Sequence, residues 1–348
     1  MTLFDCIVVG AGPAGCITAK IVAKKGFNVL ILEEHQRIGE PVQCTGLVSR
    51  RIGKIPKNIT LNKIRKARFF CDKEFFEVNS KEPMLVLDRK KYDSWLARNA
   101  EKAGAEIKTS TRFLDLKGKT IFTTKGKFQT KILVGADGPN STVAKKAKIK
   151  QPENLLFATQ VKVKSSFDVR TVELHFSSKI APGSFAWVVP ENESTARVGL
   201  MVNKNPNEYL ENFLKLRFGK TNSFDRIGDI IRYGLIRESV ADGILLVGDS
   251  ACQVKPFSAG GLIYNKICAE IAGEAVIKAL EEENFSKSFL IENYDKMWKK
   301  ELALPIKEGM LLKSIFDKIS DFPLAFKLIR ELRVANLSKI LDVDFLLK

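Results

Sequence analysis

The sequence predicts an α/β fold with a second lobe of the α+β type, on three observations. Three separate apolar runs each lead into glycine beside or near an acidic residue, as strands of a parallel sheet do where their carboxyl ends meet a ligand. Between the second and third runs, apolar and polar residues alternate, which is typical of antiparallel strands. At 348 residues the chain also exceeds the usual size of one core, so we expect two lobes.

The first run belongs to a pattern of strand, turn, helix, strand and acid. Residues 4–10 lead into Gly10-Ala11-Gly12-Pro13-Ala14-Gly15, a helical stretch follows at 16–25, and an apolar run at 29–32 stops at Glu33. A glycine-rich turn in this setting is the fingerprint of a Rossmann-type dinucleotide-binding unit. By itself the unit does not distinguish NAD from FAD, because both cofactors use the same fold.

Each glycine of the turn has a physical task. Gly10 makes the tight turn, Gly12 lets the backbone approach a pyrophosphate, and Gly15 packs the helix on the strand, with the helix N-terminus facing the phosphates. We expect Glu33 to accept hydrogen bonds from ribose hydroxyls. Glu34 is the competing acid, but the next residue of an extended chain points to the opposite side.

The two later runs identify the cofactor as FAD. Residues 132–135 lead into Asp137 and Gly138, and residues 244–247 lead into Asp249, followed by a glycine turn and a helix at 262–280. Asp249 can accept hydrogen bonds from ribityl hydroxyls, and the helix N-terminus offers donors and a positive dipole to the flavin. We therefore expect FAD to be bound by Gly10, Gly12, Ala14, Gly15, Glu33, Asp137, Gly138, Asp249, Gly260, Gly261 and Leu262.

Together these three segments resemble the motifs of flavoproteins built like para-hydroxybenzoate hydroxylase. Within that superfamily the chain is most similar to the geranylgeranyl reductase family, through Pro41-Val42-Gln43-Cys44, Leu87-Asp88-Arg89 with Asp93, and Phe185-Ala186-Trp187-Val188-Val189-Pro190. The resemblance covers about three quarters of the chain. The chain departs from the family pattern at Thr45, which precedes Gly46, and at Phe185 and Val189 in the aromatic segment.

The resemblance implies further site residues. It puts Cys44 close to the flavin, where a thiol could donate a proton during catalysis; the alternative is that Cys44 only packs beneath the ring. It gives Arg89 a cofactor role, against an ordinary ion pair with Asp93 four residues on. Phe185, Trp187 and Pro190 are expected to bind substrate, although an apolar strand face suits core packing equally well.

The remaining elements complete the expected architecture, a Rossmann-type FAD-binding domain with an inserted antiparallel sheet domain and a helical C-terminal segment. We assign residues 1–66, 88–150 and 225–283 to the FAD-binding domain, 67–87 and 151–224 to the antiparallel-sheet substrate domain, and 284–348 to the C-terminal segment. His175 falls on the polar side of its strand and is expected at the surface. The basic amphipathic C-terminal helices are expected to cap the second lobe, and in addition could rest on an anionic membrane.

Composition narrows the function classes. With 45% hydrophobic and 28% charged residues, we expect a soluble globular protein in the cytoplasm, without an export signal or a membrane span. Six scattered cysteines form no CxxC pair, which argues against a zinc, iron–sulfur or disulfide framework. The net charge of +17 favours anionic partners or simply a solvated basic surface, and no nucleic-acid-binding module is recognised.

The function that the resemblance implies is saturation of carbon–carbon double bonds in geranylgeranyl chains, of a diphosphate or an archaeal-type ether lipid, by hydride from reduced FAD. Two alternatives stay open: an aromatic hydroxylase or monooxygenase with the same flavin motifs, and a flavoprotein that relays electrons to a membrane partner without catalysis. We expect a monomer, with peripheral contact to the inner face of an anionic membrane. The electron donor is open between NADPH, ferredoxin and another small donor, because no second GxGxxG unit is present.

Overall fold

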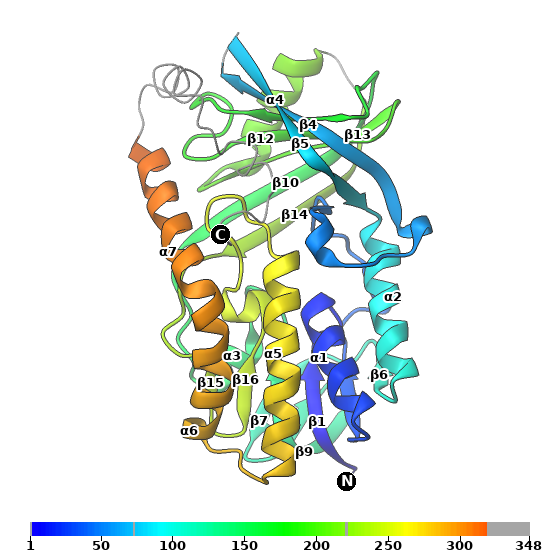
Figure 1. The fold of residues 1–348 in the computed structure, drawn as a ribbon, viewed down its shortest axis with the longest axis vertical. Helices are drawn as coiled ribbons and strands as arrows, with labels where there is room; N and C mark the ends of the chain where they lie inside the picture. The colour runs from blue at the N-terminus through cyan, green and yellow to red at the C-terminus, as the bar shows by residue number, and fades with distance from the viewer. Residues whose placement is uncertain (1, 72–73, 220–221, 319–348) are drawn as a thin grey trace.

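The computed structural model describes residues 2–71, 74–219 and 222–318 of the chain. Its elements form two sheets with helices around them, and the FAD-binding part and the second sheet lie end to end in an elongated molecule (Figure 1). Parts of the expected segments, residues 72–73, 220–221 and 319–348, lie outside the described residues. Both sheets and the helical C-terminal segment agree with the predicted fold class.

The first sheet is built around β1 (Leu3–Val9), which pairs in parallel with β2 (Val29–Leu32) and with β9 (Gly126–Gly135). Its strand order is β15-β16-β9-β1-β2-β6. The outer strands are β6 (Glu106–Lys108), β15 (Val240–Ala241) and β16 (Ile244–Leu246), and the hairpin β7 (Phe113–Lys117) and β8 (Thr120–Thr123) extends from β9. Because β1, β2, β9 and β16 run in parallel, their carboxyl ends meet at one edge of the sheet, as the three predicted runs require.

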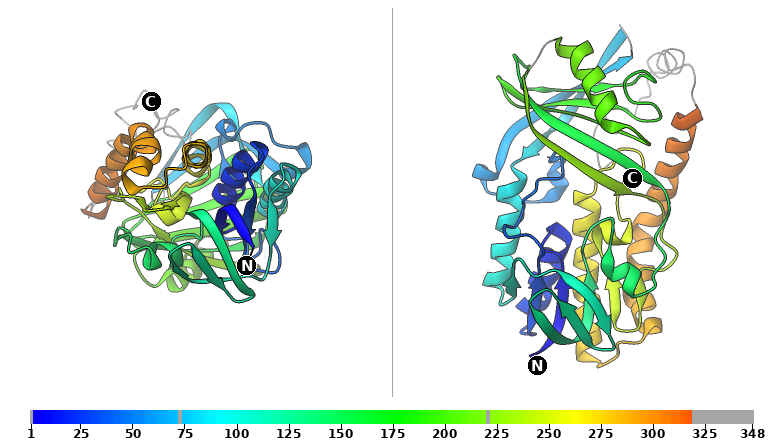
Figure 2. Two further views of the ribbon diagram at one scale, coloured as in Figure 1. Left: turned by 90° about the horizontal axis from the view of Figure 1, so that it is seen from below. Right: turned by 180° about the vertical axis from the view of Figure 1, so that it is seen from behind.

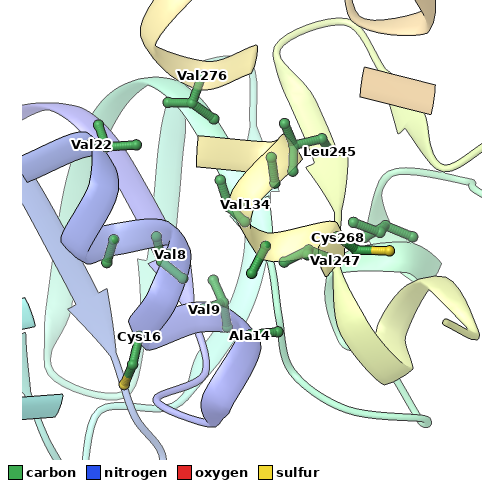
Figure 3. Close-up of a cluster of buried hydrophobic side chains, with 14 of the residues drawn as sticks. Val8, Val9, Ala14, Cys16, Val22, Val134, Leu245, Val247, Cys268 and Val276 are labelled. Carbon is green, nitrogen blue, oxygen red and sulfur yellow. The ribbon is translucent and has the colours of Figure 1, made fainter. Parts of the chain in front are cut away.

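Helices cover this sheet and close its core. They are α1 (Pro13–Lys24), α2 (Arg89–Lys102), the short α3 (Thr142–Lys146) and α5 (Leu262–Glu281). Helix α5 packs closely on α1 at Gly273, where a Cβ would lie 2.7 Å from the Ile21 side chain. Figure 3 shows part of the core between helices and sheet, with apolar side chains of β1, α1, β9, β16 and α5 meeting.

The second sheet has the order β14-β10-β13-β12-β11-β4-β5-β3. Its strands are β3 (Leu47–Val48), β4 (Thr60–Cys71), β5 (Glu74–Leu87), β10 (Leu155–Lys164), β11 (Thr171–His175), β12 (Ala186–Asn192), β13 (Thr195–Val202) and β14 (Ser223–Arg232). All neighbours pair antiparallel except β11 and β4, which run in parallel. One face looks toward the FAD-binding part, and α4 (Pro206–Phe218) packs on the other (Figure 2).

The second sheet extends beyond the predicted domain boundaries. Strand β4 begins at Thr60 rather than at residue 67, and β14 stays in this sheet until Arg232, although residues 225–232 were assigned to the FAD-binding domain. Charged residues alternate along both strands, so a search for apolar runs does not detect these segments as strands. One strand of the second sheet therefore runs across each of the assigned boundaries, β4 across the boundary after residue 66 and β14 across the boundary after residue 224.

His175 is buried rather than exposed. Helix α4 covers the side of β11 that was expected to face solvent, and its Phe213 meets the His175 imidazole edge-on at 4.9 Å between ring centroids. The imidazole also stacks on Phe70 of β4 at 4.4 Å. Its Nε2 atom lies 3.0 Å from the Glu173 carboxylate, which also binds Arg217 of α4. Burial lowers the pKa of His175. At β11 both faces of the sheet are thus covered.

The C-terminal helices α6 (Lys287–Leu290) and α7 (Lys296–Lys318) are joined by a π-helical turn at Ile291–Asp295. Apolar residues at every fourth position drift by about 40° per step around a helix of 3.6 residues per turn, and the wider π turn takes up part of this drift. Most of them pack into the core of the first domain, so the prediction that they cap the second lobe is wrong for this part. None of the described helices is long and apolar enough to cross a membrane.

Candidate functional site

A cavity of about 1070 Å³ lies between the carboxyl edge of the first sheet and the inner face of the second. The glycine turn, Glu33, Asp137 and Asp249 line it from the first domain, and strands β10 to β14 line it from the second. The three predicted cofactor segments, which are far apart in the sequence, thus meet in one place. Within the described residues, no group of three or more His, Cys, Asp or Glu side chains could hold a metal ion.

The glycine turn is packed so tightly that side chains would not fit. Gly10 has φ +103°, and a Cβ on it would lie 2.3 Å from the carbonyl oxygen of Ala136. A Cβ on Gly15 would lie 2.1 Å from the Gly10 oxygen, so this glycine packs helix against turn and does not line the cavity. Gly12 faces open space instead. The turn therefore presents bare backbone and the N-terminus of α1 to the cavity, as a pyrophosphate site requires.

Glu33 lies at the end of β2 with its carboxylate at the cavity. Oε2 accepts a hydrogen bond from the Ala11 amide at 2.8 Å, and Oε1 accepts from the His35 amide at 2.9 Å and lies 2.7 Å from Nδ1 of His35. Glu34 is exposed and pairs with Arg112. Glu34 also lines the cavity, so the choice of Glu33 over Glu34 stays a prediction, and the contact of Glu33 with His35 was not foreseen.

Asp137 has a structural task in addition to lining the cavity. Its Oδ2 accepts from the amides of Thr142 and Val143 at 2.7 and 3.0 Å, and its Oδ1 accepts from the Ser141 hydroxyl at 2.6 Å. The carboxylate therefore caps the first turn of α3. Burial raises the pKa of Asp137, although the hydrogen bonds to its carboxylate act to lower it. Gly138 follows with φ +79° and open space at its Cβ position.

Asp249 is held beside the start of α5. Its Oδ1 accepts from Nδ2 of Asn265 at 3.1 Å, and a Cβ on Gly261 would lie 3.1 Å from the same oxygen. Burial raises the pKa of Asp249, while Asn265 and Arg89 act in the opposite direction. Oδ1 of Asn265 is buried without a hydrogen-bond partner among the described residues. A hydroxyl group of a ligand in the cavity could donate a hydrogen bond to this oxygen. Gly260, Gly261 and Leu262 also line the cavity.

These features fit FAD. The bare glycine turn suits the diphosphate and Glu33 suits the adenosine ribose, while Asp249 and Asn265 at the other end suit the ribityl hydroxyls. The N-terminus of α5 lies beside them with its amides and positive dipole.

Arg89 and Cys44 both line the cavity and interact with each other. Arg89 is the first residue of α2, and its guanidinium binds both oxygens of Asp93 at 3.0 and 2.8 Å. Burial alone would lower the pKa of Arg89, but Asp93 and then Cys44 raise it. The Cys44 sulfur accepts from the Gly46 amide at 3.3 Å. The ion pair with Asp93, which was the alternative to a cofactor role, is therefore present, and Arg89 also interacts with Cys44; the cofactor role of Arg89 stays a prediction.

The aromatic segment forms an apolar wall. Phe185, Trp187 and Val189 line the cavity on one face of the chain, whereas Pro190 points away from it. Nε1 of Trp187 donates to Oε1 of Gln160 at 3.0 Å, across β13. Gly199 lies between them in register, and a Cβ there would lie 2.6 Å from the indole. Pro190 instead offers its carbonyl to Asn62 at 2.9 Å, so its predicted substrate role has no contact to support it.

Several site residues were missed by the sequence reasoning. Gln160 accepts from the Thr45 hydroxyl at 2.8 Å as well as from Trp187, so the residue that departs from the family pattern joins the loop of Cys44 to the aromatic wall. Arg197, buried and paired with Glu191 at 2.6 Å, donates to the Thr45 and Leu87 carbonyls. Asn265 was detectable, because it lies one turn into the helix that follows the third glycine turn. The sequence around Gln160 and Arg197 contains no motif that would have identified them as site residues.

Comparison with known proteins agrees with this geometry. The FAD binding domain family matches residues 4–213. Digeranylgeranylglycerophospholipid reductase of Methanosarcina acetivorans is 30% identical over 92% of this chain and 86% of its own length. Digeranylgeranylglycerophospholipid reductase 2 of Methanothermobacter thermautotrophicus is 31% identical over 99% of this chain and 95% of its own length.

Solved structures share the fold. A geranylgeranyl bacteriochlorophyll reductase-like protein of Thermoplasma acidophilum superposes with a TM-score of 0.85 at 24% identity, covering 93% of this chain and 90% of that one. Halogenase PltM, solved in complex with phloroglucinol and FAD, superposes with a TM-score of 0.73 at 16% identity, covering 98% and 85%. The FAD prediction and the resemblance noted in the sequence are confirmed. This chain belongs to the digeranylgeranylglycerophospholipid reductase family of FAD-dependent oxidoreductases.

Proposed function

We propose that this protein is an FAD-dependent reductase that saturates the double bonds of geranylgeranyl chains in an archaeal-type ether lipid. The observation that carries the proposal is the continuity of the cavity, which joins the cradle of Glu33 and Asp249 to an apolar wall. The wall contains Phe69, Val172, Leu174, Phe176, Phe185, Trp187, Val189, Met201 and Phe257. Such a surface suits a polyprenyl chain, and the names of the relatives support the same substrate class.

The residues where the FAD cradle meets the apolar wall of the cavity suit alkene reduction. When bound and reduced, FAD would supply a hydride to one carbon of the double bond, so the other carbon would need a proton from a nearby group of the protein. The thiol of Cys44 is our candidate for that donor. Arg89 interacts with the sulfur of Cys44 and would fix the position of that side chain in the cavity.

Contact with a membrane is a further part of the proposal, because the substrate is a lipid. Helix α7 exposes Met297, Leu304, Leu311 and Ile315 in one stripe, and Leu312 beside it lines the cavity. The net charge of +17 would attract an anionic lipid surface. A protein bound in this way at the inner face of the cytoplasmic membrane would have its cavity close to the lipid, and it could act as a monomer.

An anaerobic titration tests the proposal. The flavin of the photoreduced protein should be reoxidised when a digeranylgeranyl ether lipid is added, and should stay reduced with the fully saturated lipid. Reoxidation only by oxygen in the presence of an aromatic compound would favour the hydroxylase, and reoxidation only by a protein acceptor would favour the electron relay. Parallel reductions with NADPH and with reduced ferredoxin would identify the donor.

A further inference from the structure

The turn that carries Asp249 is held from behind by the side chain of Gln253, which is fully buried. The amide of Gly248 donates to Oε1 of Gln253 at 2.7 Å, and the amide of Gln253 donates back to the Gly248 carbonyl at 3.1 Å. Gly248 has φ +76°, and a Cβ on it would lie 2.8 Å from the Ala14 side chain. The position of Asp249 is therefore set by a closely packed turn whose first amide depends on one glutamine side chain.

Gln253 is in turn oriented by Tyr294, which is also fully buried. Nε2 of Gln253 donates to the Tyr294 hydroxyl at 3.1 Å, and that hydroxyl donates to the carbonyl of Leu246 at 2.5 Å, at the end of β16. Burial raises the pKa of Tyr294, so the hydroxyl keeps the proton that it donates. Each donor in this chain of three hydrogen bonds meets an acceptor, so the orientation of the Gln253 amide group is fixed. The chain joins the last residue of the strand to the turn that follows it.

Tyr294 reaches this place from the C-terminal segment. It lies in the π-helical turn Ile291–Asp295, in which Tyr294 and the next residue, Asp295, are both buried. Oδ1 of Asp295 accepts from the amide and the hydroxyl of Ser239 at 2.9 and 2.7 Å, so the turn is anchored on the first domain. Helical turns of the π type occur frequently at functional sites. At this point the C-terminal segment supports the turn of Asp249 from behind.

We propose that Tyr294 is a positioning residue for the flavin half of FAD. Through Gln253 its hydroxyl holds the turn so that the Asp249 carboxylate stays beside Asn265 at the start of α5, where the ribityl chain is expected. Without the hydroxyl, Nε2 of Gln253 would be buried without an acceptor, and the side chain that holds the Gly248 amide would lose its fixed orientation. This role concerns cofactor binding and is independent of the substrate on which the reduced flavin acts.

Two ligands separate this role from general support of the fold. Tyr294→Phe keeps the ring and removes only the hydroxyl. We expect the flavin-free, full-length variant to bind FAD about tenfold more weakly than the unchanged protein, because a buried donor is left without a partner. ADP carries only the adenosine half of the cofactor, for which Glu33 and the glycine turn form the expected site, so its affinity should not change. Isothermal titration calorimetry measures both dissociation constants.

Further variants complete the test. Gln253→Leu should weaken FAD binding at least as much as Tyr294→Phe, and adding Tyr294→Phe to it should cause little further loss, since both act on the same turn. The control is Trp298→Phe, which removes a buried hydrogen bond of the same segment, from the indole to Ser239 at 3.0 Å. It should lower the free energy of unfolding in urea without changing the affinity for FAD. Unchanged FAD affinity in Tyr294→Phe, or an equal loss of FAD and ADP affinity, would overturn the inference.

Discussion

The guanidinium of Arg89 and the carboxylate of Asp93 form a two-point ion pair across one turn of α2, with N–O distances of 3.0 and 2.8 Å. Both side chains are largely buried. Because Arg89 also interacts with Cys44 and its charge acts on Asp249, the pair joins the packing of α2 to the lining of the cavity. The ion pair therefore has a structural role in α2 and a functional role in the cavity, and suitable variants can separate the two roles.

Arg89→Met should destabilise the protein by about 3–5 kcal/mol, because it leaves the carboxylate of Asp93 buried and unpaired. The double variant Arg89→Met with Asp93→Asn removes that charge and should recover most of the free energy of unfolding, measured in urea. Lipid reduction should stay impaired in the double variant, because the cation beside Cys44 is still missing. Recovery of both stability and activity would reduce Arg89 to a packing residue.

Cys44→Ser and Cys44→Ala should bind FAD and become reduced as the unchanged protein does. Both should reduce the prenyl lipid at least about tenfold more slowly in stopped-flow experiments, equivalent to about 1.4 kcal/mol of barrier, because a hydroxyl gives up its proton far less readily than a thiol and alanine has none. Alkene reduction at full rate by the alanine variant would leave Cys44 as a residue that packs at the cavity.

Glu173→Gln should destabilise the protein at neutral pH by about 1–3 kcal/mol. Burial alone would raise the pKa of Glu173, but Arg217 and His175 outweigh it and hold the pKa at about 2. The stabilisation is therefore complete above about pH 4.5 and is lost as the pH falls toward 2. Urea unfolding between pH 3 and 7 measures it. Glu211→Gln, an exposed acid on α4 that pairs with Arg226, is the control and should change stability little.

The stripe on α7 gives a prediction for membrane binding. Replacing Leu304 and Leu311 by glutamate should weaken sedimentation with anionic ether-lipid vesicles several-fold, because it removes apolar contact and adds negative charge. The same change at Leu216, an equally exposed leucine on α4, should have little effect. Equal binding of the unchanged protein to neutral and anionic vesicles would argue against the charge attraction.

The sequence was informative where the signal is local. Gly10 and Glu33 are recognisable because a tight turn and the alternation of an extended chain constrain neighbouring residues. Gly10 does adopt a positive φ, and Glu33 does accept from the Ala11 amide of the turn, while their contacts with a cofactor stay predictions. The Trp187–Gln160 hydrogen bond could not be predicted, because it depends on β13 lying between two strands and on Gly199 leaving room.

Amphipathic patterns identified apolar faces but not their partners. The four-residue repeat that includes Trp298 correctly indicated a buried helical stripe, yet Trp298 packs in the first domain rather than the second. His175 was assigned to solvent because alternation alone does not reveal that α4 covers that side of the sheet. In both cases the missing information was which element packs on the face.

The most direct test of the proposed function is to weigh the lipid after reaction. Photoreduced protein incubated without oxygen with a digeranylgeranyl ether lipid should give products heavier by one pair of hydrogen atoms for each saturated bond, and the amount should match the flavin oxidised. Protein without FAD should give none. The account would be contradicted if the lipid kept its mass and the flavin stayed fully reduced in the presence of that lipid. A gain of oxygen by an aromatic compound under air would assign the protein to the hydroxylases instead.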